Sequence, residues 1–152
     1  VKTREALDKL IRTLWEKEKW AFEVDDSNTG DRHSAFDKAA PLGIAISYAP
    51  GVSHFVDLQG FEGGSEYAVR MLGDTFANPY MTKACHDYKR NLGVLRAIGI
   101  EPREVKEDPM IAAYLLDSGR SNFSLDFLAQ NHLDAYPPID TPEGFTASGF
   151  AA

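Results

Sequence analysis

Apolar residues recur every three or four positions near the start of the chain, which is the spacing of an amphipathic helix. They predict a helix over residues 2–18, and its apolar stripe consists of Leu7, Leu10, Ile11 and Leu14. Weaker stripes, several flanked by residues that begin or end helices, predict four more helices. These cover residues 66–76, 88–98 and 109–119, together with a short helix that starts at Ser124. Asp108, just before a proline, is a typical capping acid for the third of these.

Short aromatic and β-branched runs bounded by turn residues predict the strands. Residues 19–24 run into a polar loop, and residues 41–49 and 52–58 flank a Pro-Gly turn that is typical of a hairpin. Residues 80–85 and 103–107 predict two more short strands. Three consecutive strands followed by alternating helices and strands indicate an α/β domain with a mixed sheet.

The length and the apolar share of the chain, 152 residues with 43% hydrophobic side chains, fit one domain with a sizeable core. We expect Trp15 and Trp20 to pack the first helix against the sheet. Residues 134–152 show no hydrophobic period and contain three of the eight prolines. We therefore assign residues 1–133 to the domain and expect residues 134–152 to be a loop or a truncated C-terminal part of it.

The composition and the charge exclude several classes of protein. The single cysteine, Cys85, rules out an internal disulfide and a cysteine-rich zinc cluster. The chain shows neither a signal peptide nor a run of about 20 apolar residues, so we expect a cytoplasmic protein without membrane contact. A net charge of −7 argues against a passive nucleic-acid binder. Seven acids and one base lie in residues 107–152, however, so a basic face between Lys83 and Arg96 is compatible with the sequence.

The segment DPMIAAYLLDSGRSNFSLDFLAQNHL, residues 108–133, resembles the 3′–5′ exonuclease domain of family A DNA polymerases, the bacterial DNA polymerase I type. Earlier segments follow in the family's order. WAFEVDDS stands where the family has its Asp-x-Glu motif, and HDYKRNLGVL where it has Asn-Leu-Lys-aromatic-Asp. The resemblance implies a ribonuclease H-like fold with a mixed, mostly five-stranded sheet flanked by helices. It also implies proofreading of a single-stranded DNA 3′ end, beside a polymerase domain of the same parent chain.

In this family two Mg²⁺ or Mn²⁺ ions activate a water and stabilise the leaving oxygen, so the site is a cluster of carboxylates. The resemblance places Glu23 and Asp25 at the first motif, in reversed order but on one face of a strand. Asp87 stands where the family has an amide, and Asn91 where it has a metal-binding acid. The candidate metal ligands are Glu23, Asp25 and Asp87. The candidate catalytic residues are Glu23, Asp25 and Asn91.

The second motif also supplies the candidate contacts to nucleic acid, which are His86, Asp87, Lys89 and Arg90. Each has a plain structural alternative, since Lys89 and Arg90 also fit a solvated helix face and His86 a packed strand end. The family's third motif, an aromatic residue and an Asp on a late helix, has no counterpart after residue 133.

Three functions remain open at this point. The rearranged acids favour an impaired or inactive exonuclease domain that serves as a structural module beside the polymerase domain. The second function is an active but atypical exonuclease that uses Mg²⁺ or Mn²⁺ and takes a further acid from outside this chain. The third is a non-catalytic module that binds nucleic acid or protein and needs no metal.

Overall fold

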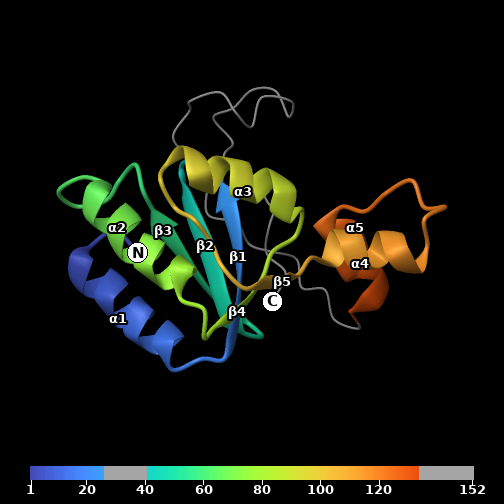
Figure 1. Cartoon of the computed structure of the whole chain (residues 1–152), viewed down its shortest axis with the longest axis horizontal. Helices are drawn as coiled ribbons and strands as arrows, with labels where there is room; N and C mark the ends of the chain where they lie inside the picture. The colour runs from blue at the N-terminus through green and yellow to red at the C-terminus, as the bar shows by residue number, and fades with distance from the viewer. Residues whose placement is uncertain (26–40, 134–152) are drawn as a thin grey trace.

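The structure is a computed structural model that describes residues 1–25 and 41–133. The prediction for residues 134–152 therefore lies outside the described residues. In the described residues five strands form one mixed sheet, which confirms the sheet that the resemblance implied, and their order is β3-β2-β1-β4-β5 (Figure 1). The pairs β1–β2 and β2–β3 are antiparallel, and the pairs β1–β4 and β4–β5 are parallel. The strands are β1 (Lys19–Asp25), β2 (Gly43–Ala49), β3 (Val52–Asp57), β4 (Thr82–Ala84) and β5 (Val105–Glu107).

The described residues also form five helices, each within a few residues of its predicted bounds. Two of them, α1 and α2, lie side by side against the sheet, and α3 crosses near the end of β1 (Figure 1). The helices α4 and α5 contact each other and form a lobe at one end of the molecule. None of the described helices is long and apolar enough to cross a membrane. Their bounds are α1 (Arg4–Trp15), α2 (Glu66–Ala77), α3 (Tyr88–Ala97), α4 (Pro109–Leu116) and α5 (Leu125–His132).

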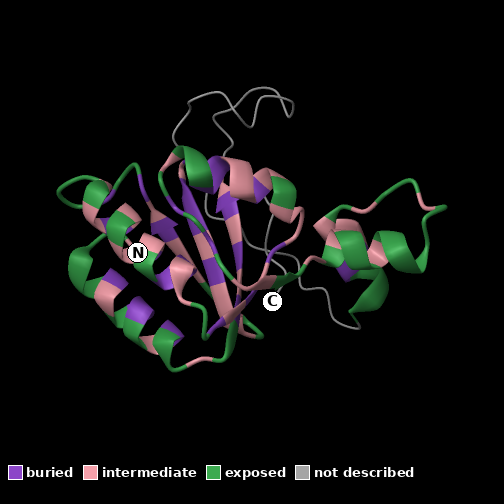
Figure 2. Cartoon of the chain, viewed as in Figure 1, coloured by how far each residue is buried: buried purple, intermediate pink, exposed green. Residues whose placement is uncertain are grey.

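The core lies between the sheet and the α1–α2 pair, and alternation along β1 decides which side chains enter it. Trp20, Phe22 and Val24 are buried (Figure 2). The rings of Trp20 and Phe22 meet the ring of Phe76 on α2 edge to face, with centroids 5.0 and 4.8 Å away. The packing prediction is confirmed for Trp20. It is wrong for Trp15, which is 59% exposed because it stands at the end of α1, beyond the four buried residues of the predicted stripe.

Lys83 on β4 is fully buried, which the sequence did not predict. Its ammonium group donates hydrogen bonds of 2.8–2.9 Å to the backbone carbonyls of Asn78, Met81 and Arg103. Burial lowers the pKa of Lys83 to about 8, so the group still carries its proton at neutral pH and can make all three bonds. The side chain therefore joins the chain on both sides of β4 and cannot belong to a basic surface.

We expect Lys83→Met to lower the free energy of unfolding by about 2 kcal/mol, because one buried and two partly buried carbonyls lose their donor. Urea-induced unfolding measures this change. Lys106→Met is the matched control, since the Lys106 side chain is 63% exposed and forms an ion pair with nearby Glu104. The control is expected to stay within about 0.5 kcal/mol of the parent chain. Equal unfolding midpoints for the two variants would contradict the structural role of Lys83.

The lowered pKa of Lys83 also predicts a pH dependence. The folded chain loses this proton near pH 8 and the unfolded chain holds it to the ordinary value of 10.5, so unfolding takes up a proton between these values. The free energy of unfolding of the parent chain, measured relative to Lys83→Met, is therefore expected to rise as the pH increases from 8 to 10.5. A difference that stays flat across this window would show that the carbonyl bonds hold the pKa at its ordinary value.

Candidate active site

The first-motif acids lie on β1 and face away from the core. Glu23 and Asp25 alternate with Phe22 and Val24, whose side chains are buried, so the two acids point to the face of the sheet where α3 lies. Both are partly exposed. The strand thus presents two carboxylates on one face, as the i, i+2 spacing predicted.

Asn91 on α3 is the central polar residue of this face and is 1% exposed. Its Oδ1 accepts a hydrogen bond of 2.7 Å from the backbone N–H of Val24. Its Nδ2 donates to the carbonyls of His86, at 3.0 Å, and Asp87, at 3.2 Å. The side chain therefore binds β1 to the turn that precedes α3, and it uses both ends of the amide to do so.

The local sequence explains why Asn91 is needed there. β4 pairs with β1 only from Lys19 to Ala21, so within the described residues no strand pairs with β1 on that side from Phe22 to Asp25. A buried backbone N–H without a partner costs about 1–3 kcal/mol. The amide of Asn91 supplies the acceptor that a longer β4 would have supplied.

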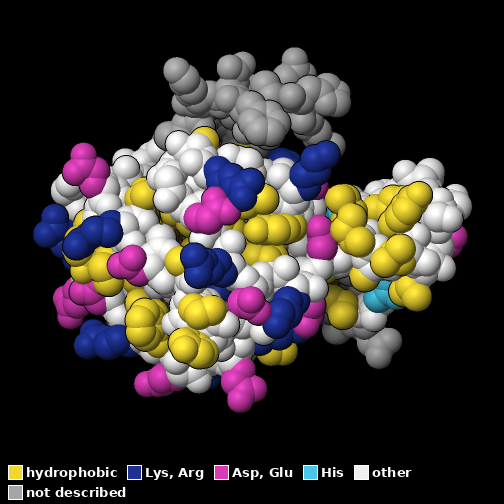
Figure 3. All heavy atoms as spheres, viewed as in Figure 1, with side chains coloured by type: hydrophobic (Ala, Val, Ile, Leu, Met, Phe, Trp, Pro, Cys, Tyr) yellow, Lys and Arg dark blue, Asp and Glu magenta, His cyan; other side chains and the backbone are white. Residues whose placement is uncertain are grey.

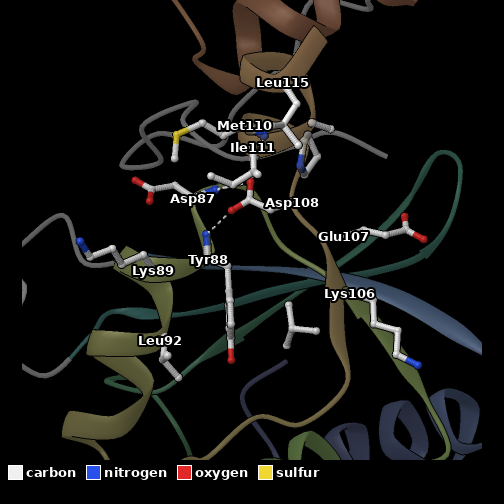
Figure 4. A pocket seen from close by; sticks show the side chains of 13 residues that line it. Asp87, Tyr88, Lys89, Leu92, Lys106, Glu107, Asp108, Met110, Ile111 and Leu115 are labelled. Atoms are coloured by element: carbon white, nitrogen blue, oxygen red, sulfur yellow. Dashed lines mark hydrogen bonds between the residues drawn. The ribbon is translucent and has the colours of Figure 1, made fainter. Parts of the chain in front are cut away.

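Asp87 precedes α3 in a left-handed conformation, with φ 50° and ψ 55°, and its side chain makes no capping hydrogen bond. Asp108 takes over this role for both helices (Figure 4). Its two carboxylate oxygens accept from the N–H groups of Asp87 and Tyr88, at 3.1 and 2.9 Å, and of Met110, at 2.9 Å. The predicted cap of α4 is confirmed, and the same carboxylate also holds the start of α3.

The cations of the second motif lie in different environments. The guanidinium of Arg90 stands 3.6 Å from the carboxylate of Glu23, and the Arg90 side chain is 37% exposed. Lys89 is exposed on α3, and Arg96 pairs with Glu101 through two hydrogen bonds. Since Lys83 is buried, the basic face compatible with the sequence is reduced, and Lys89 is its most accessible member at the motif.

Cys85 and His86 lie in the short connection between β4 and α3. Burial lowers the pKa of His86 against the opposing effect of Asp108, Asp87 and Asp126, and its buried Nδ1 has no hydrogen-bond partner in the described structure. Burial and the nearby Glu23, Asp108 and Asp87 raise the pKa of the Cys85 thiol. The imidazole is thus kept mainly neutral, and the thiol is unreactive.

The resemblance implies a centre of two metal ions, and the donor groups of this face decide whether such a centre fits. Such a site needs several negative oxygen ligands around each ion. Here Glu23 has a guanidinium beside it, and the buried group at position 91 is a neutral amide whose donor end is already engaged. Within residues 1–25 and 41–133, no three Asp, Glu, His or Cys side chains are placed to hold a metal ion. The described donor set does not fit a two-metal centre, and no hydrolytic step through one follows from it.

Two features of the site were not predicted from the sequence. The Arg90–Glu23 pair links residues 67 positions apart, and no local pattern marks such a pair. The bond between Asn91 and Val24 required knowing where β4 stops. The position of Asn91, four residues after Asp87 and three before buried Val94, indicated only that its helix face turns inward.

Comparison with solved structures supports the fold. The region similar to this chain in the Pol1 polymerase of Mycobacterium smegmatis, solved with a DNA primer-template and dNTP, has a TM-score of 0.67 at 26% identity over 88% of this chain. Escherichia coli RNase D has a TM-score of 0.58 at 19% identity over 79% of this chain. Brucella melitensis NrnC has a TM-score of 0.60 at 16% identity over 90% of this chain. The predicted ribonuclease H-like exonuclease fold is confirmed.

The chain spans only part of these proteins, namely 22% of the Mycobacterium Pol1 chain, 28% of RNase D and 63% of NrnC. No curated protein sequence matches it significantly. The family model described as 3′–5′ exonuclease matches residues 1–145. The chain therefore belongs to the 3′–5′ exonuclease family of DNA polymerase I-type proteins, as its motifs predicted.

Proposed function

We propose that this domain is an exonuclease module of a DNA polymerase I-like protein in which hydrolysis is impaired, and that it serves mainly as a structural part beside the polymerase domain. The observation that supports this proposal most directly is the buried amide of Asn91, which stands where the family has a metal-binding acid. An ionised Asp there could accept from Val24 but could not donate to the carbonyls of His86 and Asp87. This amide therefore supports the fold at a place where the chemistry needs a charge.

The pair between Arg90 and Glu23 supports the same proposal. A divalent cation bound at the first-motif acids would meet a positive charge 3.6 Å from one of its ligands. Like charges repel strongly at such distances in a partly buried site. The reversed order of Glu23 and Asp25 adds to this effect, because Mg²⁺ tolerates little error in ligand position. The positive charge of Arg90 and the positions of the two acids therefore both oppose metal binding.

Contact with a single-stranded 3′ end is a second candidate function, and the exposure of Lys89 at the start of α3 favours it. One lysine provides only a weak, salt-dependent attraction for DNA. The Pol1 relative was solved with DNA, but the present chain spans only 22% of it. The domain's own affinity for DNA is therefore proposed to be small next to that of a complete polymerase.

We expect the chain to release no nucleotides above background from the 3′ end of labelled single-stranded DNA, with Mg²⁺ or Mn²⁺ at millimolar concentration. Product lengths on a denaturing gel measure this activity. Metal-dependent shortening that is abolished by Asp25→Ala but kept by Asp74→Ala, a matched change at an exposed acid on α2, would overturn the proposal and favour the atypical active enzyme.

The structural role of the amide predicts a cost for the acid that the family uses. Asn91→Asp is expected to lower the free energy of unfolding by about 2 kcal/mol at neutral pH, because a buried carboxylate would face two carbonyls without a donor. Asn131→Asp on α5 is the control, since this exposed amide also donates to a backbone carbonyl. Chemical denaturation of both variants checks the prediction. An Asn91→Asp chain as stable as the control would show that the amide is dispensable.

A further inference from the structure

The helix α4 is apolar on every side, yet none of its residues is buried within the described structure. Its large side chains form an exposed surface, the α4 face, which consists of Ile111, Tyr114, Leu115 and Leu116. These side chains are 50%, 52%, 78% and 86% exposed, in that order. Figure 3 shows hydrophobic side chains gathered over the lobe of α4 and α5. A helix that is hydrophobic all round is expected to be covered, so the α4 face marks an interaction site.

A groove of about 820 Å³ opens beside the α4 face, between α4, the start of α3 and β5 (Figure 4). Its apolar lining comes from all three elements and includes Leu92, Val105, Met110, Ile111 and Leu115. Leu116, the next residue along the helix, is not part of this lining and stands out beside the groove. The lobe therefore presents a protruding apolar side chain and an apolar hollow next to each other.

The charges of the lobe favour a protein over a nucleic acid as the occupant. No residue of α4 is charged, and residues 108–133 as a whole contain three acids and one arginine. The phosphates of a nucleic acid or of an anionic lipid surface would thus meet an excess of negative charge and no cation on the helix. A protein surface that is itself apolar and uncharged fits the α4 face better.

A second copy of this chain offers such a surface, and its charges match those of the groove. Each wall of the groove carries one lysine and one acid. These are Lys89 and Asp87 at the start of α3, and Lys106 and Glu107 on β5. In a twofold dimer the same patch meets itself, so one balanced wall faces another and no excess of one charge opposes the contact. Because Leu116 and the groove adjoin on one molecule, the leucine of each copy can enter the groove of the other.

The area of the α4 face is sufficient for a weak dimer. A full side chain of this size has about 200 Å² of surface, so the measured exposures leave on the order of 500 Å² on each copy. Two such faces in contact remove on the order of 1,000 Å² from water, which is the lower bound for a specific protein interface. The walls of the groove add to this area. We therefore expect a dissociation constant in the micromolar range.

We propose that this chain forms a symmetric dimer in which the α4 faces of two copies pack together and each Leu116 enters the groove of the other copy. Asp87 and Lys89 line the same groove, so the second copy also lies over the start of α3, where the second motif is. The dimer rests on the apolar surface and the charges of the lobe. It does not depend on whether the domain hydrolyses DNA.

Sedimentation velocity on the full 152-residue chain, from about 1 to about 200 µM, tests the proposal. The mean mass is expected to rise from the 16.8 kDa of one chain toward twice that value. Leu115→Glu with Leu116→Glu is expected to weaken association about tenfold or more, because charges enter an apolar contact. Tyr80→Glu is the matched control and is expected to dimerise like the parent chain, since Tyr80 is 91% exposed in the loop between α2 and β4. A parent chain that stays at the mass of one copy throughout this range would overturn the proposal.

Hydrogen–deuterium exchange at the two ends of this concentration range locates the contact. The amides of α4 are expected to exchange about fivefold or more slowly at the high concentration, while those of β1 stay unchanged. In the α4 variant this difference is expected to disappear, and unchanged exchange of β1 would show that its core is still folded. A dimer whose formation leaves the exchange of α4 unaffected would place the contact elsewhere and overturn the proposal.

Discussion

The three hydrogen bonds of Asn91 hold together the part of the molecule on which the rest of the site depends. β4 is only three residues long, so the backbone of β1 beyond Ala21 has no strand on that side. The amide oxygen of Asn91 accepts a hydrogen bond from the N–H of Val24 in this backbone. The amide nitrogen of Asn91 donates two hydrogen bonds to the turn before α3. Buried backbone groups are satisfied in nearly all proteins, so this constraint decides where α3 can lie.

The same constraint connects the fold with the chemistry of the site. Asn91 both accepts and donates hydrogen bonds here, which an ionised carboxylate cannot do, and its neutral amide does not supply the negative charge that binds Mg²⁺ or Mn²⁺. The charge balance of the face is met instead by Arg90 beside Glu23. On this face the cation Arg90 thus lies beside one of the two first-motif acids, Glu23.

Asp108 connects the start of α3 with the lobe that α4 and α5 form. Because one carboxylate accepts from the first N–H groups of both α3 and α4, the two helices start at a common point and diverge from it. The divergence opens the groove between them and leaves the apolar surface of α4 exposed. The single capping residue Asp108 therefore connects the candidate site with the exposed apolar surface of α4.

The sequence by itself determined the elements, their order and the family. Hydrophobic periods, capping residues and turns act over a few positions, so the stripe of α1, the β2–β3 hairpin and the cap of α4 could all be recognised locally. The tertiary structure alone decided the roles of Lys83, Asn91, Arg90 and Trp15. Each role depends on partners that the fold brings close, such as Thr75 on α2 for Trp15 and Glu23 on β1 for Arg90. A buried lysine that binds three backbone carbonyls and a lysine in water look the same in a sequence, because the difference lies in what the fold brings beside them.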